Sequence, residues 1–144
     1  DGVPAELILD FDATDDAVHG RQEGRFFHGY YDHDCFLPLY VFCGEQLLVS
    51  YHRPSNIDGA KHAWAILKLL VGRLREAWPE VRIILRADGG FCRHKMLSWC
   101  ERHDVGYIVG LAKNKRLNAQ ASMWMARAQA AYHHSGEKIG RAHV

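Results

Sequence analysis

The stretch Leu7-Ile8-Leu9-Asp10-Phe11-Asp12 is a short apolar run that ends in acids. A run of this length and composition predicts a buried β-strand. A second stretch of the same kind, Val81 to Leu85, is apolar and rich in β-branched residues, and it leads into Asp88. We therefore expect two core strands, each followed by an acid at its carboxyl end.

Two further strand-like runs lie between these stretches, and Cys43-Gly44-Glu45 separates them. A three-residue connection that contains glycine predicts a hairpin. Pro38 indicates that the first run lies near a sheet edge or begins at that residue. The two runs are Phe36 to Phe42 and Gln46 to Tyr51.

The remaining elements alternate between helices and strands. From Ala60 to Trp78, apolar residues recur at three- and four-residue steps, which predicts a helix that Pro79 stops. The order strand, strand, strand, helix, strand, helix, strand, helix predicts one α/β domain, a mixed sheet with helices on its faces. The later elements are expected at Lys95 to Arg102 (helix), Tyr107 to Leu111 (strand) and Ala119 to Tyr132 (helix).

The composition is that of an ordinary soluble domain, with 48% hydrophobic and 24% charged residues. The formal net charge of +1 argues neither for nor against a nucleic-acid partner. No apolar run is long enough to cross a bilayer, so we expect no membrane association. The four cysteines form no CxxC pair, which favours reduced cysteines of a cytoplasmic protein over a zinc site.

Asp12 and Asp88 are the candidate functional residues, because each lies where a core strand gives way to a loop. If the two strands are neighbours, their acids converge outside the carboxyl ends of the sheet, where α/β folds bind ligands. Two such carboxylates repel each other, and a hard divalent cation, Mg²⁺ or Mn²⁺, relieves that repulsion. A single Asp more often closes a turn. Two of them in this element order favour a metal site for phosphoryl transfer.

The first acidic stretch also has the form DxDxT, which looks like the nucleophile loop of haloacid-dehalogenase-type phosphatases. Asp10 would then attack phosphorus and Asp12 would act as the general acid. A glycine-rich stretch and a hairpin follow the loop here, whereas that family places a helical region after it. This phosphatase is the alternative function.

Six stretches in a specific order resemble DDE-type transposases of bacterial insertion sequences, in particular the group named after insertion sequence 1380. The resemblance implies a ribonuclease-H-like fold, with Asp12 and Asp88 as two of the catalytic acids that bind Mg²⁺ or Mn²⁺. It leaves Asp10 as a supporting residue, or as the ligand in a shifted register. The stretches are residues 9–16, 19–24, 29–32, 37–42, 86–91 and 114–117.

The same resemblance implies the function and the partners. We expect metal-dependent DNA strand cleavage and strand transfer on transposon ends and target DNA. The full-length protein is expected to act as a homodimer in the bacterial cytoplasm, associated with the nucleoid.

The third acid of that family, a Glu on a helix beyond the fifth strand, has no match here, since neither Glu101 nor Glu137 has the required place. We therefore interpret residues 1–138 as a partial DDE catalytic domain, shortened at both ends. Residues 139–144 resemble the translation of a sequencing adapter and are interpreted as a non-native tail. Such a fragment would cut DNA weakly or not at all, and a third hypothesis is an inactive DNA-binding remnant.

Several other residues are candidates for DNA contact. Lys113, Lys115 and Arg116 form an expected basic loop that would contact phosphates or simply face solvent. The segment from Arg93 to Lys95, just after the second acid, has the same two interpretations. Four aromatic residues could stack on bases, although we favour core packing for them: Phe26, Phe27, Tyr30 and Tyr31. We expect core packing also for Trp64, Trp78 and Trp99. His19 and His28 are candidates to approach the first acid.

Overall fold

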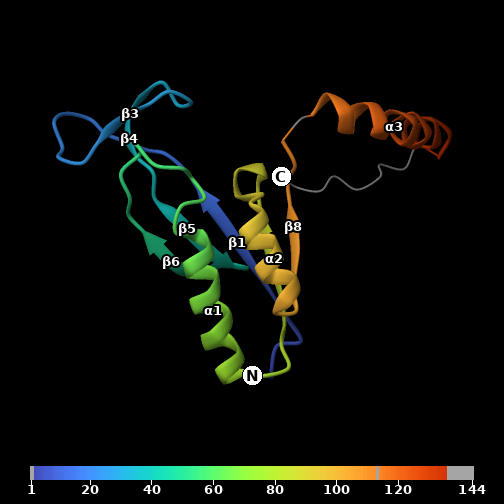
Figure 1. The fold of residues 1–144 in the computed structure, drawn as a ribbon, viewed down its shortest axis with the longest axis horizontal. Helices are drawn as coiled ribbons and strands as arrows, with labels where there is room; N and C mark the ends of the chain where they lie inside the picture. The colour runs from blue at the N-terminus through green and yellow to red at the C-terminus, as the bar shows by residue number, and fades with distance from the viewer. Residues whose placement is uncertain (1, 113, 136–144) are drawn as a thin grey trace. The chain divides into compact units, whose positions relative to one another are not determined.

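The larger of two sheets in the computed structural model has five strands in the order β6-β5-β1-β7-β8 (Figure 1). The structure describes residues 2–112 and 114–135. They belong to two units, Asp1–Gly110 and Leu111–Val144, which are described separately. The strands of the sheet are β1 (Glu6–Ala13), β5 (Leu39–Cys43), β6 (Gln46–Tyr51), β7 (Arg82–Ala87) and β8 (Val105–Val109).

The directions of the strands divide this sheet into two halves. β1 pairs antiparallel with β5, and β5 pairs antiparallel with β6. On its other side, β1 pairs parallel with β7, which pairs parallel with β8. A three-strand meander that continues into parallel strand–helix units is the ribonuclease-H-like arrangement, and the expected fold class is confirmed.

A second, three-stranded sheet of order β2-β4-β3 was not expected from the sequence. Its strands, β2 (Asp16–Ala17), β3 (Phe26–His28) and β4 (His33–Phe36), are two to four residues long. Such short strands show no clear alternation, and Gly20 and Gly24 turn the chain between them at positive φ. The first hairpin run is therefore split, because β5 begins directly after Pro38 and lies inside the large sheet.

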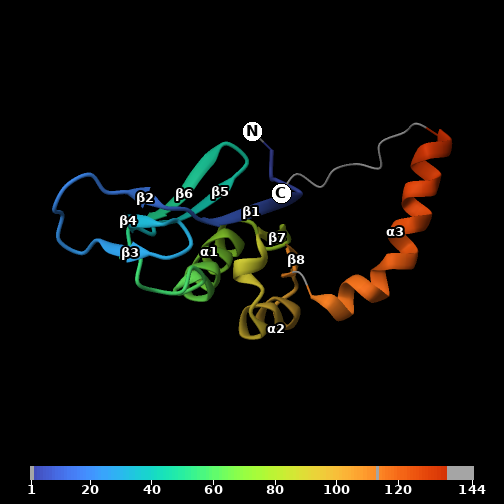
Figure 2. The same ribbon diagram turned by 90° about the horizontal axis from the view of Figure 1, so that it is seen from above.

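Two helices cover one face of the large sheet (Figure 2). They are α1 (Ala63–Ala77) and α2 (His94–Arg102), and a short 3₁₀ turn, Gly89–Phe91, precedes α2. Burying apolar side chains between the sheet and these helices supplies the main stabilisation of the unit. The core consists of Leu9, Phe11, Leu39, Val41, Ile83, Leu85 and Val105 from the strands and Leu67, Val71, Met96, Trp99 and Cys100 from the helices, with Trp64 and Trp78 packed against it.

Strand alternation places the acids of β1 on the other face of the sheet. Leu9 and Phe11 enter the core, so Asp10 and Asp12 point away from the helices. The core strand expected from Val81 to Leu85 is β7, which continues to Ala87 and leads into Asp88. The fold thus leaves both candidate metal ligands outside the packed core.

The second unit contains the helix α3 (Lys115–Ser135), which is longer than expected. Asn114 caps it, because its side-chain oxygen accepts a hydrogen bond of 2.9 Å from the backbone N–H of Arg116. The expectation of a basic loop is therefore wrong for Lys115 and Arg116, which lie in the first helical turn. Lys113 and the proposed tail, residues 139–144, lie outside the described residues. Within residues 2–112 and 114–135, no helix is long and apolar enough to cross a membrane.

Arg53 is the one charged side chain of the first unit that the described core encloses, with 1% of its surface exposed. Its Nε donates to the carbonyl of Leu37 at 2.8 Å. Its Nη1 donates to the carbonyls of Gly59 and Lys61 at 3.1 and 2.6 Å. The guanidinium group therefore fixes the segment before β5 and the turn before α1 to one another.

We expect Arg53→Met to lower the free energy of unfolding by about 3 kcal/mol, because three backbone carbonyls lose a charged donor. Urea denaturation of the purified chain measures this difference. The control is Arg82→Met, which removes an exposed ion pair with Glu6 and should change stability by less than about 0.5 kcal/mol. Equal stability of the two variants would contradict the role assigned to Arg53.

Candidate active site

Asp12 and Asp88 lie side by side at the carboxyl ends of β1 and β7. The parallel register pairs Asp10 with Arg86 and Phe11 with Ala87. Asp12 is the next residue of β1 and Asp88 directly follows the last residue of β7, so the register brings them together. The sequence pattern identified the two acids as candidates but did not predict how β1 and β7 pair. The packing of Leu9 and Leu85 in the core fixes the register between these strands.

The two carboxylates affect each other electrostatically. The pKa of Asp12 is raised, first because partial burial disfavours its charged form and second because the Asp88 carboxylate repels it. A backbone hydrogen bond from Ala13 acts in the opposite direction. The phenol of Tyr31 lies in the same negative field, since burial and then the charges of Asp15, Tyr30, Asp12 and Asp88 raise its pKa.

The loop after β7 holds Asp88 in a defined conformation. The backbone N–H of Gly90 donates to Oδ1 of Asp88 at 2.8 Å, which caps the 3₁₀ turn. Gly110, just after β8, donates from its backbone N–H to the carbonyl of Ala87 at 3.1 Å. A Cβ atom at Gly110 would lie only 2.9 Å from the backbone nitrogen of Gly89. The end of β8 therefore approaches the Asp88 loop so closely that only glycine fits there.

Asp10 is engaged elsewhere. Nη2 of Arg86 donates to its Oδ2 at 2.6 Å, and Nε of Arg86 donates to its Oδ1, so the pair is bidentate. Its place on the neighbouring strand explains this contact, because the register puts Arg86 directly beside Asp10. A carboxylate held in this way is a poor nucleophile, which argues against the phosphatase alternative.

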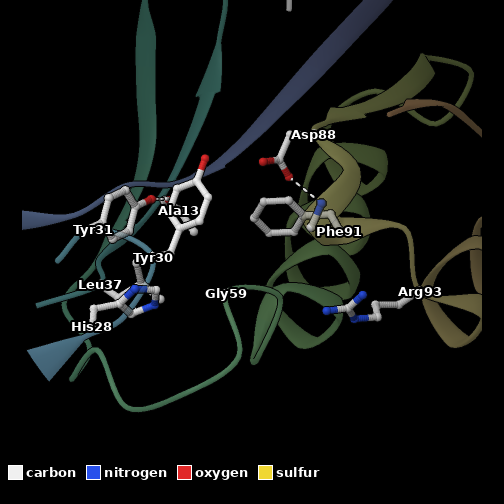
Figure 3. Close-up of a pocket in the computed structure, with 10 residues that line it drawn as sticks. Ala13, His28, Tyr30, Tyr31, Leu37, Gly59, Asp88, Phe91 and Arg93 are labelled. Carbon is white, nitrogen blue, oxygen red and sulfur yellow. Dashed lines mark hydrogen bonds between the residues drawn. The ribbon is translucent and has the colours of Figure 1, made fainter. Parts of the chain in front are cut away.

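A pocket of about 150 Å³ opens beside Asp88. Figure 3 shows Tyr30, Tyr31 and His28 on one side of it and Phe91 and Arg93 on the other. The hydroxyl of Tyr31 donates to the carbonyl of Ala13, the residue after Asp12, at 3.5 Å. Asp88 thus lines the pocket directly, and the lining also includes Ala13, the residue after Asp12. Ala13, Leu37, Gly59 and Gly90 complete its lining.

The structure separates the other candidate residues by location. Phe26, Phe27 and Tyr30 have exposed side chains, 84% in the case of Tyr30, so the expectation of core packing is wrong for these three. His28 lines the pocket, whereas His19 is not among the lining residues. The ammonium group of Lys95 lies 3.9 Å from the centre of the Trp64 ring, on the helical face of the sheet. Of the three residues from Arg93 to Lys95, only Arg93 reaches the pocket.

The donor set suits a hard cation in part. Asp12 and Asp88 offer oxygen ligands that repel each other, which is the condition a divalent ion relieves. Among the described residues, no group of three or more His, Cys, Asp or Glu side chains lies close enough together to hold a metal ion. The described residues could therefore offer two carboxylates to such an ion, Asp12 and Asp88.

A ribonuclease-H-like sheet with two acids at the ends of adjacent parallel strands is the arrangement expected of a DDE-type transposase catalytic domain. The sequence matches the family model described as "Transposase DDE domain group 1" over residues 2–143. The chain belongs to this transposase DDE domain family.

No curated protein matches the sequence. Among solved structures, the chain is similar to a chain of the cryo-EM structure of the simian T-cell lymphotropic virus intasome in complex with the PP2A regulatory subunit B56 gamma. The TM-score is 0.45 and the sequence identity 8%, over 96% of this chain and 45% of the other. This chain thus spans less than half the length of that one.

We expect Asp12→Asn to stabilise the metal-free protein at neutral pH. The folded state raises the pKa of Asp12 above its ordinary value of 3.8, so it binds the proton more tightly than the unfolded state does. That contribution is complete below pH 3.8 and is lost as the pH rises through the raised value. At pH 7 the variant should therefore melt about 2 °C higher than the parent chain, and the difference should close in acid.

Thermal unfolding with a chelator present, between pH 3 and pH 8, measures this effect. Asp16→Asn is the control, because its side chain is exposed on β2, and it should leave the melting temperature unchanged. An Asp12→Asn variant that is less stable than the parent at pH 7 would count against the electrostatic cost assigned to this site.

Proposed function

We propose that this chain carries the catalytic core of a DNA transposase, in which Asp12 and Asp88 bind Mg²⁺ or Mn²⁺ for DNA strand cleavage and strand transfer. The observation that carries the proposal is the placement of these two acids at the carboxyl ends of neighbouring parallel strands, where burial and the Asp88 carboxylate raise the pKa of Asp12. Membership of the transposase DDE domain family supports the same function.

The chemistry follows from the properties of the acid pair. DDE transposases generally use divalent metal ions, and such an ion activates a water or a 3′-hydroxyl and stabilises the leaving oxygen in phosphoryl transfer. Asp12 and Asp88 would hold it, with Oδ1 of Asp88 oriented by the N–H of Gly90. The Gly89–Gly90 segment leaves space for the DNA backbone to approach Asp88.

The finer parts of the proposal rest on the sequence resemblance. We infer that the chain is related to the insertion sequence 1380 group, with residues 1–138 as a DDE catalytic domain. The partners would be transposon ends and target DNA, and the full-length protein would be a homodimer acting on the bacterial nucleoid. Lys115 and Arg116 at the start of α3, with Lys113 before it, would contribute phosphate contacts.

Metal binding tests the assignment of the acids directly. We expect the chain to bind Mn²⁺, and Asp12→Asn and Asp88→Asn each to weaken binding about tenfold or more, because each removes one ligand. Asp10→Asn is the matched control on the same strand face and should leave the affinity unchanged, since Arg86 occupies that carboxylate. Electron paramagnetic resonance of free Mn²⁺ measures the affinity.

The outcomes separate the hypotheses. If Asp10→Asn loses Mn²⁺ binding and Asp12→Asn does not, the metal ligand on β1 is Asp10 and not Asp12. If the parent chain binds no Mn²⁺, the metal-dependent enzyme is rejected, and the hypothesis of an inactive DNA-binding remnant is favoured instead.

We expect DNA cleavage by this chain alone to be weak or absent. Two carboxylates coordinate the cation less completely than three, and no third acid joins them among the described residues. Incubation of supercoiled plasmid with the purified chain and Mn²⁺, resolved on a gel, measures nicking. Robust nicking that disappears in Asp88→Ala would overturn this expectation and show that two acids suffice.

A further inference from the structure

The pocket beside Asp88 contains one strong cation. Among its lining residues, Arg93 carries the only guanidinium or ammonium group. Figure 3 shows its side chain extending into the pocket from the residue that precedes α2. A DNA phosphate that approaches Asp12 and Asp88 meets two negative charges, and a neighbouring cation lowers that barrier.

The guanidinium of Arg93 is held in place by one hydrogen bond, and most of its N–H donors remain available. Nη2 of Arg93 donates to Oδ2 of Asp58 at 2.7 Å. Neither Nε nor Nη1 of Arg93 has an acceptor among the described residues, and half of the side chain is exposed. A guanidinium with one edge anchored and the other open matches the geometry by which arginine binds phosphate oxygens.

Asp58 is itself fixed by the fold. Its Oδ1 accepts a hydrogen bond of 2.8 Å from the backbone N–H of Ala60. Partial burial raises the pKa of Asp58, but the hydrogen bonds from Ala60 and Arg93 outweigh this effect and leave the pKa below its ordinary value. The buried Arg53 fixes the same turn through the carbonyls of Gly59 and Lys61. The core thus positions Arg93 indirectly, because Arg53 holds the turn that carries Asp58 and Asp58 forms an ion pair with Arg93.

The backbone of Arg93 is equally constrained. Its N–H donates to the carbonyl of Phe91 at 2.7 Å, and its own carbonyl accepts from the N–H groups of Met96 and Leu97 at 2.9 and 3.1 Å. Arg93 is therefore the N-cap residue of α2, which begins at His94. Its Cα and its guanidinium are both fixed, so the side chain meets a phosphate with little loss of conformational freedom.

We propose that Arg93 binds a phosphate of the DNA next to the acid pair, and that Asp58 is the positioning residue that holds its guanidinium in the pocket. The proposal rests on the proposed function, because it takes DNA as the substrate. It adds a phosphate subsite made from the loop before α1 and the start of α2.

The test compares DNA affinity and metal affinity in the same variants. The probe is a fluorescein-labelled duplex oligonucleotide, and anisotropy is measured from low to moderate salt. We expect Arg93→Ala to lower the affinity about three- to tenfold and to reduce the slope of log K against log salt by about 1, because one phosphate contact is lost. Arg93→Lys should restore part of the affinity. Arg82→Ala is the control, since Arg82 lies at the opposite end of β7, and it should change neither quantity.

Asp58→Ala distinguishes positioning from simple charge. Removal of a negative charge by itself would strengthen DNA binding, whereas loss of the anchor of Arg93 weakens it. We expect a two- to threefold loss of affinity, about 0.5 kcal/mol or slightly more, and no loss when Arg93 is already alanine. A gain of affinity in Asp58→Ala would overturn the positioning role.

The metal measurement keeps the two proposals apart. Mn²⁺ affinity should be unchanged in Arg93→Ala, because Arg93 is not a ligand. If the parent chain binds no Mn²⁺ but Arg93→Ala still weakens DNA binding, the proposed metal site fails and the phosphate subsite stands. If Mn²⁺ binding follows the acids but Arg93→Ala binds DNA like the parent, the subsite is wrong. Failure of the parent chain to bind the duplex at low salt would overturn the subsite as well.

Discussion

The parallel pairing of β1 with β7 is the constraint on which the candidate site depends. These strands are separated in sequence by the small sheet, the β5–β6 hairpin and α1, and only their adjacency in the large sheet makes Asp12 and Asp88 neighbours. Apolar side chains on the other face of the strands, Leu9 and Leu85 among them, enter the core and fix the register. A slip of one residue would bury the acids and expose the apolar residues, so hydrophobic packing protects the geometry of a polar site.

This arrangement has an electrostatic cost that the fold accepts. Burial and mutual repulsion raise the pKa of Asp12, which means that the ionised pair destabilises the protein without a cation. Acids elsewhere on the same surface have basic partners, as Asp10 has Arg86 and Asp34 has Arg25. Asp12 and Asp88 instead face each other, and the Asp88 carboxylate adds to the effect of burial on Asp12. A pair of unneutralised acids at strand ends is the feature expected of a site that binds a positive ligand.

A second constraint runs through Arg53. Its side chain is buried and joins the segment before β5 to the turn before α1, and that turn carries Asp58 and Gly59. Gly59 lines the pocket, and Asp58 holds Arg93. One buried guanidinium thus holds the loop that contributes Gly59 to the pocket lining. The acids thus depend on the large sheet, and the position of Arg93 depends on the loop that Arg53 joins to that sheet.

Much of the large sheet, with the two acids at its strand ends, was predictable from the amino-acid sequence. The two apolar runs that end in Asp12 and Asp88, the glycine-containing hairpin and the helical periodicity of residues 60–78 are local patterns, and they predicted the fold and the two acids. The same local reasoning missed the small sheet, because two- to four-residue strands carry too little alternation. It also placed Lys115 and Arg116 in a loop, since it overlooked the capping role of Asn114.

What the sequence determined by itself is the set of elements and the chemistry at their ends. What only the tertiary structure decided is which charges meet. Asp10 and Asp12 are alike in the sequence, yet the register gives one of them Arg86 and the other Asp88. Arg93 and Lys95 are equally basic and two residues apart, yet one enters the pocket and the other lies over Trp64. Pairings between distant residues depend on register and packing, which arise only when the whole core forms.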